Sequence, residues 1–324
     1  MISASDLNGM MAMMPAFATD NAGDIDATAT VSADRLEKGL DRMIRDGANV
    51  VSTTGSFGEF HTLLQDEFAL LAQTASEVNN RRVPLFIGTT GLNSRDVVQK
   101  MRIVEKTKAE GVLLGVPFYF PSSPANVVNF YRSIAERFPK LGIMIYHNPP
   151  LHNVSLPLAL MEQLAKIDGV VAMKDSHRGT GEFLRMQAGP AKRIRVFVNQ
   201  LQYTAYQPMG AAGFWSIDAW MGPWPQFALR DAVSRKDFAA ANAITVEIAG
   251  VKGGDKDPAW RETAAKVAVR YAGYVDPGPL RPPFVEVPAE VDETQKKRVV
   301  AWQKLCEKYK PATAKKQSNE RVEA

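Results

Sequence analysis

Short apolar runs recur along the chain, and segments with helical patterning separate most of them. The runs span residues 9–17, 49–54, 84–90, 111–117, 142–148, 169–173, 195–199 and 213–217. The sixth run, Gly-Val-Val-Ala-Met, is small or apolar at every position. This is typical of a strand in a parallel sheet that is covered on both faces. Strands that alternate with helical segments predict parallel pairing between neighbours.

Helix signals stand between these runs. Ser32 is placed to cap a helix that continues through Ile44 and ends at Gly47. Further helices are expected at residues 65–79, 94–109, 124–138 and 157–166. Eight strand–helix units predict an α/β fold, a closed (β/α)8 TIM barrel. The alternative is a doubly wound open sheet, which would need a glycine-rich phosphate turn after its first strand. Met13-Met14-Pro15 is no such turn.

The chain continues well beyond the eighth run. Helices are expected at residues 225–234, 238–249, 260–271 and 294–309, with an extended linker at 276–283. We expect residues 1–222 to form the barrel and residues 223–310 to form a C-terminal helical extension of the same domain. Residues 311–324 have few apolar side chains and are expected to be disordered.

Composition fits a soluble globular enzyme, because 45% of the 324 residues are hydrophobic and 23% are charged. The net charge of +4 is spread along the chain, so it does not indicate a nucleic-acid partner. The single cysteine, Cys306, excludes an internal disulfide framework and favours a reducing, cytoplasmic location. We expect no signal peptide and no membrane span, which needs about 18 apolar residues.

The carboxyl ends of barrel strands carry the chemistry in this fold. Lys174, after the sixth run, is the only lysine at such an end. Partial burial favours the neutral amine, which is the nucleophile of a Schiff-base enzyme. The alternative is an ordinary surface lysine just past a strand.

Other strand ends supply binding groups. Gly55, Ser56 and Phe57 lie in a turn whose backbone N–H groups could hold a carboxylate. Tyr146 could move protons beside a Schiff base, or it could simply cap the barrel core. The remaining polar and aromatic candidates for substrate binding at strand ends are Tyr119, Asn148, Trp215 and Ser216.

Aromatic residues gather near the same strand ends. Phe118, Tyr119 and Phe120 follow the fourth run, and Trp215, Trp220 and Trp224 follow or end the eighth. Such residues usually belong to the core, but here they also suggest an aromatic mouth for a flat apolar substrate.

Four further residues are open to two interpretations. His147 and His152 are interpreted as polar loop residues, because no carboxylates lie at metal-ligand spacing from them. No metal is therefore expected. Arg178 and Arg261 are candidates to hold an acidic ring substituent, or are solvated surface arginines.

Three motifs in order resemble the dihydrodipicolinate synthase and N-acetylneuraminate lyase superfamily. They are GSFGE after the second run, YHNP after the fifth and VVAMKDS around Lys174. The resemblance covers about residues 5 to 285. It implies that Lys174 forms the Schiff base and that Tyr146 relays protons. It also implies that Ser56 and Phe57 hold the pyruvyl carboxylate, and that Tyr119 lies near a subunit contact in a homotetramer.

Departures from the superfamily pattern indicate one branch. Leu151 stands where dihydrodipicolinate synthases have an arginine for the aldehyde's carboxylate. Three sequence features resemble the hydratase-aldolases of aromatic hydrocarbon catabolism: GSFGE, the FWS of residues 214–216 and RPPF near Phe284. In those enzymes a tryptophan commonly occupies the position of Tyr119.

The resemblance implies a lyase that cleaves a substituted benzylidenepyruvate to an aromatic aldehyde and pyruvate. No cofactor is expected, because the lysine iminium is the electron sink. The alternatives are another 2-oxo-acid aldolase, dehydratase or synthase with a non-aromatic substrate, and a non-catalytic barrel that senses a 2-oxo acid.

Overall fold

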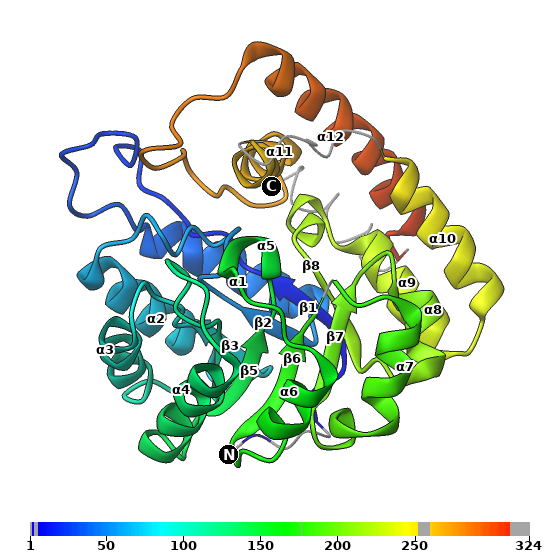
Figure 1. The fold of residues 1–324 in the computed structure, drawn as a ribbon. Helices are drawn as coiled ribbons and strands as arrows, with labels where there is room; N and C mark the ends of the chain where they lie inside the picture. The colour runs from blue at the N-terminus through cyan, green and yellow to red at the C-terminus, as the bar shows by residue number, and fades with distance from the viewer. Residues whose placement is uncertain (1, 3–5, 176, 252–259, 312–324) are drawn as a thin grey trace.

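The chain forms a closed barrel of eight parallel strands in sequence order, β1 to β8 (Figure 1). We describe a computed structural model, which covers residues 2, 6–175, 177–251 and 260–311. The strands are β1 (Gly9–Met13), β2 (Val50–Ser52), β3 (Leu85–Gly88), β4 (Gly111–Leu114), β5 (Gly142–Tyr146), β6 (Val170–Lys174), β7 (Arg195–Asn199) and β8 (Gly213–Ser216). Pairing of β1 with β8 closes the barrel. The predicted TIM barrel is confirmed.

Apolar strands are needed because both faces of the sheet are buried. Met11 and Met13 of β1 point into the barrel interior, where they pack with Phe86 and Met144. Met10 and Ala12, on the other face, pack between the barrel and its helices. Every residue of β1 is buried, so the strand has no polar face for solvent.

Helices surround the barrel in the order that the chain meets them. They are α1 (Ala33–Asp46), α2 (Gln65–Asn79), α3 (Ser94–Val104), α4 (Pro124–Arg137), α5 (Pro149–His152), α6 (Leu158–Leu164), α7 (Thr180–Ala188) and α8 (Tyr203–Tyr206). Ser32 caps α1 by accepting from the Arg35 N–H, and Gly47 ends it with φ +118°. Three helices were not predicted: α5, α7 and α8. Two are only four residues long, and none of the three has a side-chain N-cap.

The C-terminal region is helical, as the sequence predicts. It contains α9 (Trp224–Ser234), α10 (Phe238–Gly250), α11 (Arg261–Ala272) and α12 (Ala289–Tyr309). Helix α9 contacts β1, and α12 packs against both α9 and α11. Helix α11 lies over the end of the barrel where the strands finish (Figure 1). The predicted disordered tail, apart from Pro311, lies outside the described residues. The division of the chain at residue 222 stays a prediction.

Two segments far apart in sequence lie side by side beside the barrel. The loop between β1 and α1 and the segment between α11 and α12 meet at the edge of the barrel end (Figure 1). The backbone N–H of Ala18 donates to the carbonyl of Pro277 at 2.9 Å. This contact ties the C-terminal region to the first strand–helix unit.

Candidate active site

Lys174 is the last residue of β6, and its side chain is almost completely buried. Its Nζ lies 3.7 Å from the centre of the Trp215 ring and 4.8 Å from the centre of the Tyr146 ring. Burial lowers the pKa of Lys174 to about 8, although the charges of Glu262 and Asp175 act in the opposite direction. The amine is therefore far easier to deprotonate than an ordinary lysine.

Tyr146 ends β5 directly opposite Lys174 in the strand register. Its hydroxyl is 2.9 Å from the Ser56 Oγ and accepts from the Asn148 Nδ2 at 3.3 Å. Burial raises the pKa of Tyr146, although the hydrogen bonds from Ser56 and Asn148 lower it. The phenol is therefore protonated at neutral pH and connected to a second hydroxyl.

The turn after β2 brings Ser56 to this position. It needs unusual backbone angles, since Thr54 and Glu59 both have positive φ values of 43° and 51°. A side chain at Gly58 would meet the Thr54 nitrogen at 2.6 Å, so only glycine fits there. Gly55 also lies against Tyr146, with 3.9 Å between an ideal Cβ and the ring. Phe57 packs into the core beneath the turn.

A buried charge network lies next to the lysine. Asp175 is 2.6 Å from the Arg178 Nε and 3.2 Å from the His147 Nδ1. Burial alone would raise the pKa of Asp175, but the His147 hydrogen bond and the Arg178 charge hold it below its usual value. Arg178 also donates to the carbonyl of Leu156. Arg178 is therefore neither a substrate contact nor a solvated arginine, because its guanidinium is buried and already bound to Asp175 and to the Leu156 carbonyl.

The histidine interpretation also needs correction, since His147 and His152 are both buried. His147 belongs to the Asp175 network. The ring of His152 packs edge-on against Tyr146, with centroids 4.8 Å apart. Burial lowers the pKa of His152 to about 4, so the ring is neutral at pH 7. Within the described residues, no group of three His, Cys, Asp or Glu side chains is arranged to hold a metal.

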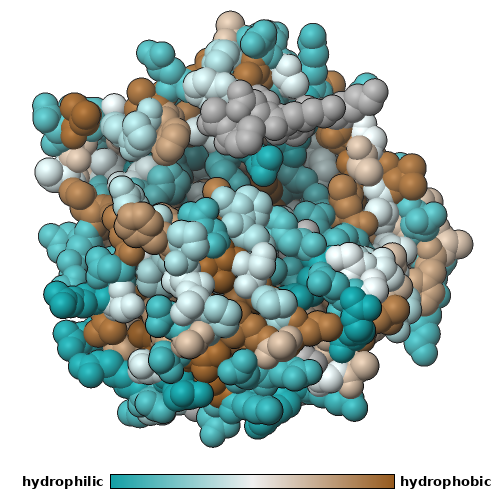
Figure 2. Space-filling view, in the orientation of Figure 1, coloured by the Kyte–Doolittle hydropathy of each residue, from teal (hydrophilic) through white to brown (hydrophobic). Residues whose placement is uncertain are grey.

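A cavity of about 270 Å³ opens beside Ser56, between the strand ends and α11. In the space-filling view the surface is hollowed between the barrel and the C-terminal helices (Figure 2). The lining is mostly apolar, and four of its residues are phenylalanines. The cavity is lined by Ser56, Phe57, Glu59, Phe60, His61, Phe118, Leu151, His152, Glu262, Thr263 and Phe284.

Several of these lining residues were missed as site residues. Phe60 and His61 follow the GSFGE motif, and Phe284 lies in the RPPF motif. Their position in or next to these motifs could have marked them as candidate site residues. Glu262 and Thr263 reach the site from α11, and no local pattern marks them.

Other predicted site residues lie elsewhere. Tyr119 is 70% exposed, packs edge-on against Phe120 and does not line the cavity of this chain. The Ser216 hydroxyl donates to the Gln200 Oε1 at 2.7 Å. Arg261 is exposed at the start of α11. The prediction that Trp220 and Trp224 belong to an aromatic mouth is wrong, because both side chains are packed in the hydrophobic core.

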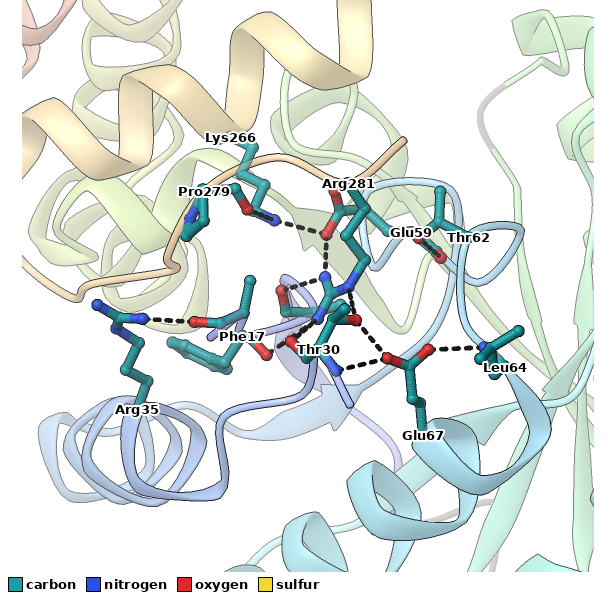
Figure 3. Close-up of polar contacts among 12 residues, drawn as sticks. Phe17, Thr30, Arg35, Glu59, Thr62, Leu64, Glu67, Lys266, Pro279 and Arg281 are labelled. Carbon is teal, nitrogen blue, oxygen red and sulfur yellow. Dashed lines mark hydrogen bonds and ion pairs between the residues drawn. The ribbon is translucent and has the colours of Figure 1, made fainter. Parts of the chain in front are cut away.

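An ion cluster joins α11 to the turn after β2 (Figure 3). One oxygen of Glu59 lies 2.6 Å from the Lys266 Nζ and 2.7 Å from the Arg281 guanidinium. Arg281 also donates to the carbonyls of Ala16, Phe17 and Thr30. Burial lowers the pKa of Lys266 to about 8, although Glu59 opposes this shift. The cluster connects the turn that carries Ser56 to the helix that lines the other side of the cavity.

Replacement of Lys266 by methionine should therefore destabilise the fold. The change keeps the length of the side chain but removes one cation from a buried carboxylate, which costs about 3 kcal/mol. Urea unfolding of Lys266→Met should report this loss in the free energy of unfolding. Lys38→Met removes an exposed pair with Asp34 and should change it by less than about 0.5 kcal/mol. A loss below about 1 kcal/mol in Lys266→Met would show that the cluster is not structural.

Comparisons with known proteins agree with this arrangement. The chain is 32% identical over 322 residues to the trans-O-hydroxybenzylidenepyruvate hydratase-aldolase of Pseudomonas aeruginosa, covering 95% of this chain and 96% of that one. It is 26% identical to the trans-2'-carboxybenzalpyruvate hydratase-aldolase of Nocardioides sp. strain KP7, over the same shares. The solved structure of PhdJ bound to substrate intermediate matches with a TM-score of 0.88 and 27% identity, covering 95% of this chain and 99% of that one.

The barrel and these relatives define an enzyme, a carbon–carbon lyase. The chain belongs to the dihydrodipicolinate synthetase family, whose model matches residues 10–302. The resemblance inferred from the three motifs is therefore confirmed. In the part of the chain that the structure describes, no helix is long and apolar enough to span a bilayer.

Proposed function

We propose that this enzyme is a pyruvate-dependent hydratase-aldolase that uses Lys174 as a Schiff base and cleaves a benzylidenepyruvate. The single observation that carries the proposal is the buried amine of Lys174, held between the rings of Trp215 and Tyr146 beside a cavity lined by phenylalanines. The relatives whose names specify hydratase-aldolase activity on aryl substrates support it.

The reaction begins when Lys174 condenses with the 2-oxo group of the substrate. The iminium withdraws electrons, and water adds to the conjugated double bond. Tyr146 then accepts the proton of the new hydroxyl as the carbon–carbon bond breaks. Its own proton passes to the Ser56 hydroxyl, which in turn gives its proton to water in the cavity that Ser56 lines. The enamine left on Lys174 is protonated and hydrolysed to pyruvate. No metal or organic cofactor takes part in this scheme.

We assign the substrate's carboxylate and its aryl ring to different residues of the site. The turn at Ser56 and Phe57 is our candidate for the pyruvyl carboxylate, with Asn148 beside Tyr146. An aryl ring buried against Phe60 and Phe118 would contribute a few kcal/mol, at about 25 cal/mol per Å². Arg261, at the start of α11, remains a candidate to contact an acidic substituent on the ring.

Substrate preference tests the proposal. The enzyme should have its highest kcat/KM on o-hydroxy- or o-carboxybenzylidenepyruvate. Leu151 lines the cavity and cannot pair with an aldehyde's carboxylate, and a polyhydroxylated chain would lose hydrogen bonds to water against these rings. The measurement is pyruvate release from each benzylidenepyruvate and from N-acetylneuraminate, together with condensation of pyruvate with aspartate semialdehyde. A higher kcat/KM on either of the last two would favour the non-aromatic alternative.

The homotetramer implied by the resemblance and the cytoplasmic location remain part of this proposal. The exposed pair Tyr119 and Phe120 is the surface on which a subunit contact would be sought.

A further inference from the structure

Glu262 is a carboxyl group in the cavity wall that the scheme above does not use. It is the second residue of α11, it is partly buried, and it lines the cavity together with Ser56 and Phe118. Within the described residues, its carboxylate forms no hydrogen bond or ion pair. Glu59, which lines the same cavity, instead has its carboxylate occupied by Lys266 and Arg281. Of the two carboxylates that line the cavity, Glu262 is therefore the one that can accept a proton from a bound substrate or water.

The charge of Glu262 is felt by both predicted catalytic groups. It raises the pKa of Lys174 and also that of Tyr146, so these groups share one electrostatic environment. Burial raises the pKa of Glu262 itself, while the charges of Lys174 and Arg261 act in the opposite direction. A carboxylate whose pKa lies above its ordinary value is a better proton acceptor, and the most effective bases titrate near the working pH.

The position of Glu262 is fixed by the ion cluster. Lys266 follows it by four residues, so the two side chains project from the same face of α11. Lys266 donates to Glu59 and to the carbonyl of Pro279 (Figure 3). The helix is thereby anchored to the turn that carries Ser56, and Glu262 is held over the space where the substrate's aryl end would lie.

We infer that Glu262 is the general base of the hydration step. The inference deepens the proposed function and rests on it, because it divides the two chemical steps between two residues. Tyr146 serves the cleavage step through its hydrogen bond with Ser56. Glu262 lines the cavity, and its carboxylate can take a proton of water directly, without a relay.

The step balances as follows for a substrate bound to Lys174 as an iminium. The oxygen of water bonds to C4, the carbon that carries the aryl ring. The electron pair of the C3–C4 double bond moves to C2–C3, and the iminium becomes a neutral enamine. The proton released by water passes to the Glu262 carboxylate. The resulting carboxylic acid returns it to C3, which restores the iminium for cleavage with Tyr146.

Synthesis in the reverse direction separates the two steps. Wild-type enzyme with pyruvate and benzaldehyde should form the hydroxy acid and then dehydrate it to benzylidenepyruvate. Glu262→Gln keeps the shape of the side chain but cannot accept a proton. It should consume benzaldehyde within about threefold of the wild-type rate, yet dehydrate the adduct about 10²-fold more slowly, so that the hydroxy acid accumulates. Chromatography of both products measures the ratio.

Matched variants identify the cause of any change. Glu262→Asp keeps a carboxylate and should dehydrate faster than Glu262→Gln. Glu37→Gln, an exposed carboxyl on α1, should match the wild type in both steps. Borohydride trapping of pyruvate by Glu262→Gln checks that the site has folded. The inference is overturned if Glu262→Gln dehydrates normally, or if it loses both steps equally while still trapping pyruvate. Failure of the wild type to trap pyruvate would instead contradict the proposed function, and this inference would fall with it.

Discussion

Borohydride reduction in the presence of pyruvate is expected to attach one reduced pyruvyl group to the enzyme, at Lys174. Its pKa is about 8, so roughly a tenth of the amine is neutral at pH 7, compared with well below a thousandth for an ordinary lysine. The amine also faces the rings of Tyr146 and Trp215, and it has no ion-pair partner among the residues that the structure describes. Lys174→Ala should therefore lose both trapping and turnover. Intact mass and peptide mapping locate the adduct.

The chain supplies its own control for this experiment. Burial also lowers the pKa of Lys266 to about 8, but its amine is bonded to Glu59 and to the carbonyl of Pro279. A lowered pKa alone would label both lysines, whereas a catalytic site would label only Lys174. An adduct on Lys266, or full activity in Lys174→Ala, would contradict the Schiff-base assignment.

The pH dependence of trapping has a definite sign. Only the neutral amine attacks the carbonyl, and its fraction increases as pH approaches the pKa of Lys174 from below. The trapping rate at fixed pyruvate should rise up to about pH 8 and then level off. A rise that continues toward pH 10.5 would indicate an ordinary, solvated lysine.

The eight strands and Lys174 could be predicted because their signal is local. A strand buried on both faces must be apolar at consecutive positions, as in β5 and β6. A lysine at the end of such an apolar run is therefore easy to identify in the sequence. Helix α7 was missed because it has only nine residues and its N-cap, Gly179, has no side chain to cap it.

The cavity wall could not be predicted because it is made by distant segments. Glu59 meets Lys266 and Arg281 across 207 and 222 residues, and this contact helps to hold the helix that carries Glu262 at the barrel end. The direction of a side chain after a strand is equally hard to predict. Trp215 faces Lys174, whereas Trp220, five residues later, packs against Phe17 in the core. Arg178 did have a local signal that was missed, since Asp175 stands three residues before it.

Tyr146→Phe should lower turnover by about 10²-fold or more, because it removes the proton carrier and keeps the ring. The hydroxyl links Ser56 and Asn148, so its loss also breaks the connection through which a proton could leave the substrate. The ring contacts with His152 and Lys174 do not involve the hydroxyl and should persist. Pyruvate trapping at Lys174 should therefore remain detectable while steady-state release of pyruvate from benzylidenepyruvate falls.

Tyr131 is the matched control for this change. It is also a buried tyrosine, and its hydroxyl donates to the carbonyl of Leu114 at 2.8 Å, but it belongs to α4, on the outside of the barrel. Tyr131→Phe loses a comparable buried hydrogen bond, about 1 kcal/mol of stability, without touching the site. A specific fall in Tyr146→Phe, with turnover unchanged in Tyr131→Phe, would separate proton transfer from stability. Near-normal turnover in Tyr146→Phe would instead assign Tyr146 to packing at the mouth of the barrel.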